Sequence, residues 1–131
     1  MERSADWLKQ AKRDLEKAEL DCKNEYYEWC CFTAQQSAEK AVKAVYQKLN
    51  MSIKGHSIVK MLEELRAASV QEPEELLHAA RILDRYYTVS RYPNGFPEGS
   101  PAEYFDEKIA QEALDAAHKI VRWCDDKIST V

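Results

Sequence analysis

Apolar side chains recur at steps of three and four residues along most of this 131-residue chain. That spacing matches the 3.6-residue turn of an α-helix and gathers the apolar residues on one face. No segment shows the strict alternation that is typical of a half-buried strand. The chain has only 3 Gly and 4 Pro, most of them within residues 93–101, so few hairpin turns can form. The sequence therefore predicts an all-α fold.

The periodic pattern breaks into five predicted helices in a single domain that spans residues 1–131. They cover residues 4–24, 25–50, 58–65, 74–89 and 101 onward. The second helix is expected at the centre of the fold, because it has many small residues and its apolar positions cover a wide part of its surface. Short connections favour an up-and-down bundle of four main helices plus one short helix. The residues expected to cap or open the helices are Ser4, Ser57 or His56, Pro73, and Ser100 or Pro101.

Charge and composition exclude several classes of protein. The net charge of −4 argues against a general coat for nucleic acid, although it permits a local basic pocket. No window approaches 18 apolar residues and the first residues carry no apolar run, so we expect neither a membrane span nor a signal peptide. The 4 cysteines lack the spacing of a zinc site and are expected to be reduced thiols in a cytoplasmic protein. We expect no metal and no cofactor.

Arginines and tyrosines crowd into the stretch RYYTVSRYPNG at the end of the fourth predicted helix. One explanation is purely structural: the helix dipole favours arginines near a helix C-terminus, and the tyrosines pack against the rest of the fold. Alternatively, Pro93 holds the exit so that Arg91 and Tyr92 stay extended and form a phosphate and base pocket with Arg85, supported by Tyr86. The cluster is thus a candidate cationic site on an acidic protein.

Two further stretches supply candidate residues. In KGHSIVKML, Lys54 and His56 precede a helix start, where backbone N–H groups favour anions, although this loop can equally be a plain cap. In AQQSAEKAVKA, Gln35 and Glu39 lie near the apolar side of the second helix, where buried hydrogen bonding is expected. We therefore expect Gln35 and Glu39 to hold the ligand-binding residues in place without contacting the ligand themselves.

Three segments in this order, AQQSAEKAVKAVYQKL, GHSIVKMLEEL and LDRYYTVSRYPNGFP, resemble the HEPN domain family. The resemblance covers nearly the whole chain. It implies a bundle of four or five helices, often a homodimer, that binds nucleotide. It also implies an association with a minimal nucleotidyltransferase, as in toxin–antitoxin pairs, and many members are metal-independent ribonucleases.

The ribonuclease branch of that family carries an Arg followed, after four to six residues, by His. No arginine of this chain has a His at that distance. Without that imidazole as general acid and base, binding of a nucleotide, RNA or a nucleotidyltransferase partner is favoured over catalysis. A ribonuclease that uses His56 instead, and a structural adaptor without a ligand, remain the alternatives.

Overall fold

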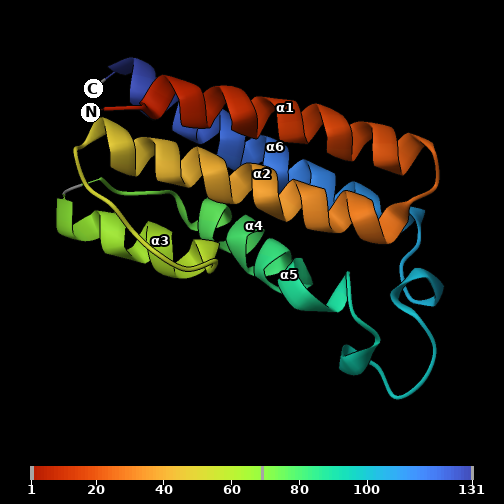
Figure 1. Cartoon of the computed structure of the whole chain (residues 1–131). Coiled ribbons are helices and arrows are strands. Elements are labelled where there is room, and N and C mark those ends of the chain that lie inside the picture. Colours follow the sequence, from red (N-terminus) through yellow and green to blue (C-terminus); the bar gives the residue numbers. More distant parts are fainter. Residues whose placement is uncertain (1, 69, 131) are drawn as a thin grey trace.

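The computed structural model describes residues 2–68 and 70–130, and its regular elements in those ranges are all helical. Three long helices, α1 (Ser4–Lys23), α2 (Tyr27–Lys48) and α6 (Glu107–Thr130), run side by side, and the chain ends lie together (Figure 1). The shorter helices α3 (Ile58–Leu65), α4 (Glu74–Asp84) and α5 (Tyr86–Val89) cover one side of that layer. The predicted all-α, up-and-down bundle is confirmed.

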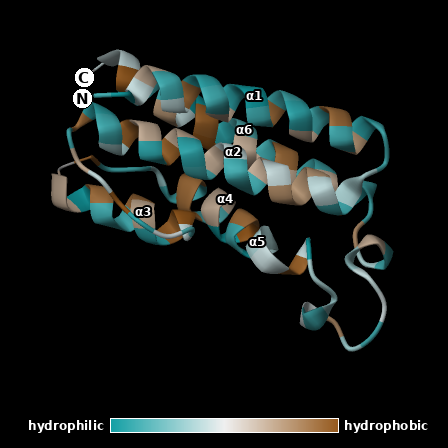
Figure 2. Ribbon diagram, viewed as in Figure 1, coloured by the Kyte–Doolittle hydropathy of each residue, from teal (hydrophilic) through white to brown (hydrophobic). Residues whose placement is uncertain are grey.

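Helix α2 is the centre of the bundle, as its pattern of small residues predicts. It packs against α1, α6, α3, α4 and α5. Close approach is possible because alanines at fully buried positions leave room for neighbouring helices: Ala34, Ala38, Ala41 and Ala44. Figure 2 shows the complementary pattern, with hydrophilic residues dominating the visible outer face of α1.

Several helix boundaries differ from those the sequence predicts. Ser4 is the first helical residue of α1 and not its cap, which is Arg3. The fourth predicted helix is interrupted at Arg85, where α4 ends and α5 begins. Pro101 opens only the short 3₁₀ turn Pro101–Glu103, with Ser100 as its cap, and α6 begins later, at Glu107. The predictions of residues 58–65 as a helix and of Ser57 as its cap are confirmed.

The cysteines are free thiols in a packed environment. Cys30, Cys31 and Cys124 are fully buried, and Cys22 is half-buried. Burial disfavours the charged thiolate and raises the pKa of Cys31 to about 12. These thiols are therefore structural residues of the core.

Candidate functional site

The chain brings an imidazole, a guanidinium and aromatic rings together where α2, the connector before α3, and α5 meet. We define the α2–α5 site as Phe32, Glu39, His56, Tyr87 and Arg91. Phe32 and Glu39 project from α2, His56 lies in the connector, Tyr87 lies on α5, and Arg91 follows α5. The residues come together because the connector runs back along α2 before α3 begins (Figure 1).

His56 forms a pair with the buried carboxylate of Glu39. The distance from His56 Nδ1 to Glu39 Oε1 is 3.0 Å, and the side chains are 51% and 7% exposed, respectively. An ionised carboxylate can only accept, so Nδ1 donates in this pair and Nε2 is directed to other partners. The Nε2 atom has no hydrogen-bond partner among the described residues. The carboxylate thus fixes both the tautomer and the orientation of the imidazole.

Two further side chains hold Glu39 in place. Lys43 Nζ lies 3.1 Å from Glu39 Oε2 and offsets the buried negative charge. Gln35, which is fully buried, donates from Nε2 to Glu39 Oε1 at 3.2 Å and to the His56 carbonyl at 3.1 Å. Gln35 therefore ties the connector to α2 at the position of His56.

The other face of the site is aromatic. The rings of His56 and Tyr87 stack with centroids 4.2 Å apart and planes 17° from parallel. The Arg91 guanidinium carbon lies 4.3 Å from the Phe32 centroid, 4.8 Å from that of Tyr87 and 5.0 Å from that of Tyr92. Such distances are those of cation–π contacts. The guanidinium is thus held among rings beside the imidazole.

Arg91 is also a helix cap. Its Nε and Nη2 atoms donate to the Tyr87 carbonyl at 3.0 and 2.8 Å, at the C-terminal end of α5. One edge of the guanidinium is therefore occupied by backbone. The outer edge, formed by Nη1 and the second proton of Nη2, remains available for an end-on bidentate contact with an anion.

The backbone N–H groups at the start of α3 already have a protein acceptor, which favours the plain cap over the anion site that the sequence also suggests. The Asp84 carboxylate already accepts from Ile58 N at 2.8 Å, from Val59 N at 3.1 Å and from Ser57 Oγ at 3.0 Å. Ser57 Oγ in turn accepts from Lys60 N at 3.2 Å. A phosphate cannot dock on these N–H groups, because a protein carboxylate from α4 fills the position.

The remaining predicted residues lie as follows. Tyr92 is 50% exposed with its ring against Arg91. Arg85 and Lys54 are exposed, and their side chains form no hydrogen bond or ion pair with the described residues. Tyr86 faces away from the site: its ring packs on Phe105 at 5.6 Å, and burial raises the pKa of its hydroxyl. The sequence does not indicate the roles of Phe32, Tyr87 and Asp84. The position of Phe32 on the predicted central helix is the one signal that could have indicated its role.

No group of three or more His, Cys, Asp or Glu side chains within residues 2–68 and 70–130 is placed to hold a metal ion. In the same ranges, no helix is long and apolar enough to cross a membrane. The side chains of the α2–α5 site, together with Tyr92, offer a ligand a guanidinium edge, an imidazole Nε2 and an exposed ring.

Comparison with known proteins places this arrangement in a family. Residues 4–127 match the HEPN domain, and the chain belongs to the HEPN domain family. It is 40% identical to TT1696 from Thermus thermophilus, whose crystal structure superposes with a TM-score of 0.93 over 97% of this chain and 99% of that one.

Two further solved structures are similar. ST0689, described as an archaeal HEPN homologue, is 42% identical with a TM-score of 0.83, covering 98% of this chain and 99% of that one. A HEPN domain protein from Thermotoga maritima is 37% identical with a TM-score of 0.78, covering 95% and 98%. A search of curated proteins gives no match. The predicted membership of the HEPN family is confirmed.

Proposed function

We propose that this protein binds a nucleotide, free or at the end of an RNA, at the α2–α5 site. The observation that carries the proposal is the Arg91 guanidinium, which lies among three aromatic rings with one edge free, next to an oriented imidazole. A phosphate bonded to that edge and to His56 would leave the attached base near the exposed ring of Tyr92. Lys54 and Arg85, both exposed, would add long-range attraction for the anion.

Calorimetry with AMP, GMP, CMP and UMP tests this proposal. Arg91→Ala should weaken binding by roughly ten- to a hundredfold, since a charge-assisted contact is typically worth about 1.5–3 kcal/mol. Arg91→Lys should recover only part of the affinity, because an ammonium cannot reproduce a planar fork. Arg81→Ala is the matched control: this exposed arginine pairs with Glu74 at 3.8 Å, outside the site. Equal affinities for wild type, Arg91→Ala and Arg81→Ala would reject the proposal.

A second function, cleavage of RNA, is favoured by one observation: the His56–Glu39 pair leaves Nε2 as the atom that could move a proton. His56 would take the proton of a ribose 2′-OH as that oxygen attacks phosphorus. The bond from phosphorus to the 5′ oxygen would break, and the proton would pass from His56 to that departing oxygen. The products would be a 2′,3′-cyclic phosphate and a 5′-hydroxyl. If the protein cleaves RNA in this way, the cyclic phosphate and the 5′-hydroxyl should form in the presence of EDTA and should not form with His56→Ala. RNA that stays intact with pure wild-type protein would exclude this function.

We also propose that the protein forms a two-fold homodimer in the cytoplasm. Tyr26 and Trp29, at the start of α2, are 58% and 45% exposed, which is unusual for large rings and typical of subunit interfaces. The reduced, buried thiols suit a reducing compartment. Light scattering should give about twice the 15.2 kDa of one chain, and a mass of one chain at tens of micromolar would contradict the dimer.

A minimal nucleotidyltransferase is the protein partner we propose, as in a toxin–antitoxin pair. The support is the family membership together with a site suited to nucleotide phosphate. Purification of the tagged protein from its own cells, followed by mass spectrometry that retains small molecules, tests for both proposed partners, the nucleotide and the nucleotidyltransferase. Recovery of the protein alone would leave the ligand-free adaptor as the remaining alternative.

A further inference from the structure

An exposed indole continues the α2–α5 site along α2. Trp29 lies one helical turn before Phe32, and the two rings meet edge to face with centroids 6.1 Å apart. The Phe32 centroid in turn lies 4.3 Å from the Arg91 guanidinium carbon. Trp29 is therefore separated from the guanidinium by the width of one ring, and a nucleotide held by Arg91 and Tyr92 does not use it.

Two rings near the guanidinium have surface available for a ligand. Trp29 is 45% exposed, and Tyr92, whose centroid lies 5.0 Å from the Arg91 guanidinium carbon, is 50% exposed. Phe32 and Tyr87 are half-buried and pack between the helices. Among residues 2–68 and 70–130, no aromatic ring other than Phe32 contacts Trp29. Trp29 and Tyr92 are thus the rings on which a ligand can stack.

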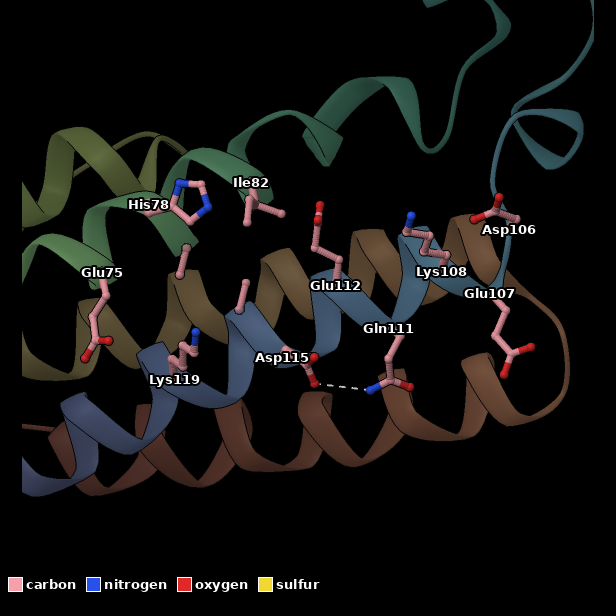
Figure 3. Close-up of a pocket in the computed structure, with 12 residues that line it drawn as sticks. Glu75, His78, Ile82, Asp106, Glu107, Lys108, Gln111, Glu112, Asp115 and Lys119 are labelled. Carbon is pink, nitrogen blue, oxygen red and sulfur yellow. Dashed lines mark hydrogen bonds between the residues drawn. The ribbon is translucent and has the colours of Figure 1, made fainter.

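The opposite side of α5 is unsuitable for a nucleic-acid strand because it is acidic. A cleft of about 850 Å³ lies between α4 and α6. Five carboxylates line it, against two lysines (Figure 3): Glu75, Asp106, Glu107, Glu112 and Asp115. Burial raises the pKa of the Tyr86 hydroxyl on α5, and the charges of Glu112 and Asp106 raise it further, so this acidic surface reaches α5. A strand that left Arg91 in this direction would meet like charge.

The surroundings of Trp29 suit a base better than a phosphate. Glu25, which is exposed, and Glu28, which is half-buried, precede Trp29 in the chain and repel a second phosphate. Arg91 is the cation that lies among the rings of the site. The surface therefore provides for one phosphate at Arg91 and for an uncharged, planar group at Trp29.

We propose that the protein binds two adjacent unpaired nucleotides of a single strand, with the phosphate between them on Arg91, one base on Tyr92 and the other base on Trp29. The second base position depends on the proposed function, because it takes the phosphate at Arg91 as given. Every nucleobase has a π-face, so stacking on these rings tolerates any sequence. The bases of a duplex stay paired and stacked on each other, so they cannot reach the two rings.

The competing occupant of the Trp29 surface is a second copy of this chain. The exposed rings of Tyr26 and Trp29 support the proposed homodimer, but only Trp29 contacts Phe32 and so adjoins the ligand. If Trp29 serves the ligand, light scattering should give the same mass for Trp29→Ala as for wild-type protein. A fall from dimer to monomer in Trp29→Ala would assign this ring to the subunit interface and overturn the proposal.

Calorimetry with the dinucleotide ApA and its two abasic analogues, each of which lacks one adenine, tests the second base position. All three ligands carry the same charge, so they differ only in stacking. Wild-type protein should bind ApA about tenfold more tightly than either analogue. In Trp29→Ala, ApA should bind about tenfold more weakly, and one analogue should bind as well as ApA, because the ring that held the missing base is gone.

Two further variants control for loss of surface area and of folding. Tyr26→Ala removes an exposed ring from the same turn of α2 that does not contact Phe32, and its affinity for ApA should stay within about twofold of the wild-type value. Trp29→Leu keeps an apolar contact with Phe32 without a π-face, and it replaces Trp29→Ala if that variant unfolds. Equal affinity of wild-type protein for ApA and the analogues, or equal losses in the Trp29 and Tyr26 variants, would overturn the proposal.

AMP, which has one base, separates this inference from the proposed function. Its affinity should stay within about twofold of the wild-type value in Trp29→Ala and should fall in Arg91→Ala, because Tyr92 and Arg91 can hold it without Trp29. Binding of AMP that depends on Arg91, together with equal affinity for ApA and its analogues, would refute the second base position and leave nucleotide binding in place. Failure of wild-type protein to bind either AMP or ApA would refute the proposed function itself.

Discussion

Asp84 is the residue whose removal most directly tests how the site is assembled. Its carboxylate, on the last residue of α4, accepts from Ile58 N, Val59 N and Ser57 Oγ at 2.8, 3.1 and 3.0 Å. It therefore caps α3 from another helix and fixes the chain next to His56. Loss of a local cap costs about 0.5–2 kcal/mol, and hydrogen bonds to a charged group contribute about 1.5–3 kcal/mol each.

Asp84→Ala should lower the free energy of unfolding by about 2–4 kcal/mol. The value is less than the sum of the separate contacts because water can reach the freed N–H groups at this half-buried position. Urea denaturation with fluorescence detection measures the change. Asp84→Asn keeps one acceptor oxygen and should cost about half as much. Hydrogen exchange should accelerate at the Ile58 and Val59 amides.

The control for Asp84 is Asp106→Ala. Asp106 accepts only from Ile109 N, at 2.9 Å, within its own exposed helix start, so its loss should cost about 0.5–2 kcal/mol. A cost for Asp84→Ala no larger than that for Asp106→Ala would refute the idea that Asp84 joins two helices. Unchanged exchange at Ile58 and Val59 would refute it as well.

Three further predictions concern the core and the site. Burial raises the pKa of Cys31 from 9.0, and that of Tyr46 from 10.0, to about 12 in each case. Their stabilising contribution is therefore complete well below pH 9 and is lost as pH rises toward 12, so the urea midpoint should fall between about pH 9 and 12. Gly95→Ala should reduce stability by about 1–3 kcal/mol in thermal unfolding, because an added Cβ would lie 2.6 Å from Val89 Cγ1. Glu39→Gln, which removes the charge paired with Lys43 and His56, should cost about 1–3 kcal/mol by urea unfolding, and an unchanged midpoint would contradict the buried ion pair.

The periodic parts of the fold could be predicted from the sequence because they depend on local patterns. Apolar spacing was sufficient for the bundle and for the central place of α2, and Ser57 was recognisable as a cap because its hydroxyl bonds to Lys60 N only three residues away. The start of α6 was misjudged because Pro101 is equally suited to open a 3₁₀ turn. Local signals do not distinguish these two outcomes.

The site could be predicted only in part because its contacts depend on tertiary packing. His56 meets Glu39 and Gln35 across 17 and 21 residues of sequence, which requires the connector to fold back on α2. Neighbouring residues on a helix point about 100° apart, so whether Tyr86 or Tyr87 faces the site depends on the break at Arg85. No spacing rule places that break.

A single titration tests most directly whether the α2–α5 site binds a nucleotide. Isotope-labelled protein is titrated with AMP while backbone amide and arginine side-chain signals are followed by NMR. Binding at this site should produce saturable shifts at Phe32, Glu39, His56, Tyr87 and Arg91, with the Arg91 side-chain signals among the largest. These shifts should be lost in Arg91→Ala protein that melts as a folded bundle. Shifts that avoid these residues, or that persist unchanged in Arg91→Ala, would contradict binding at this site.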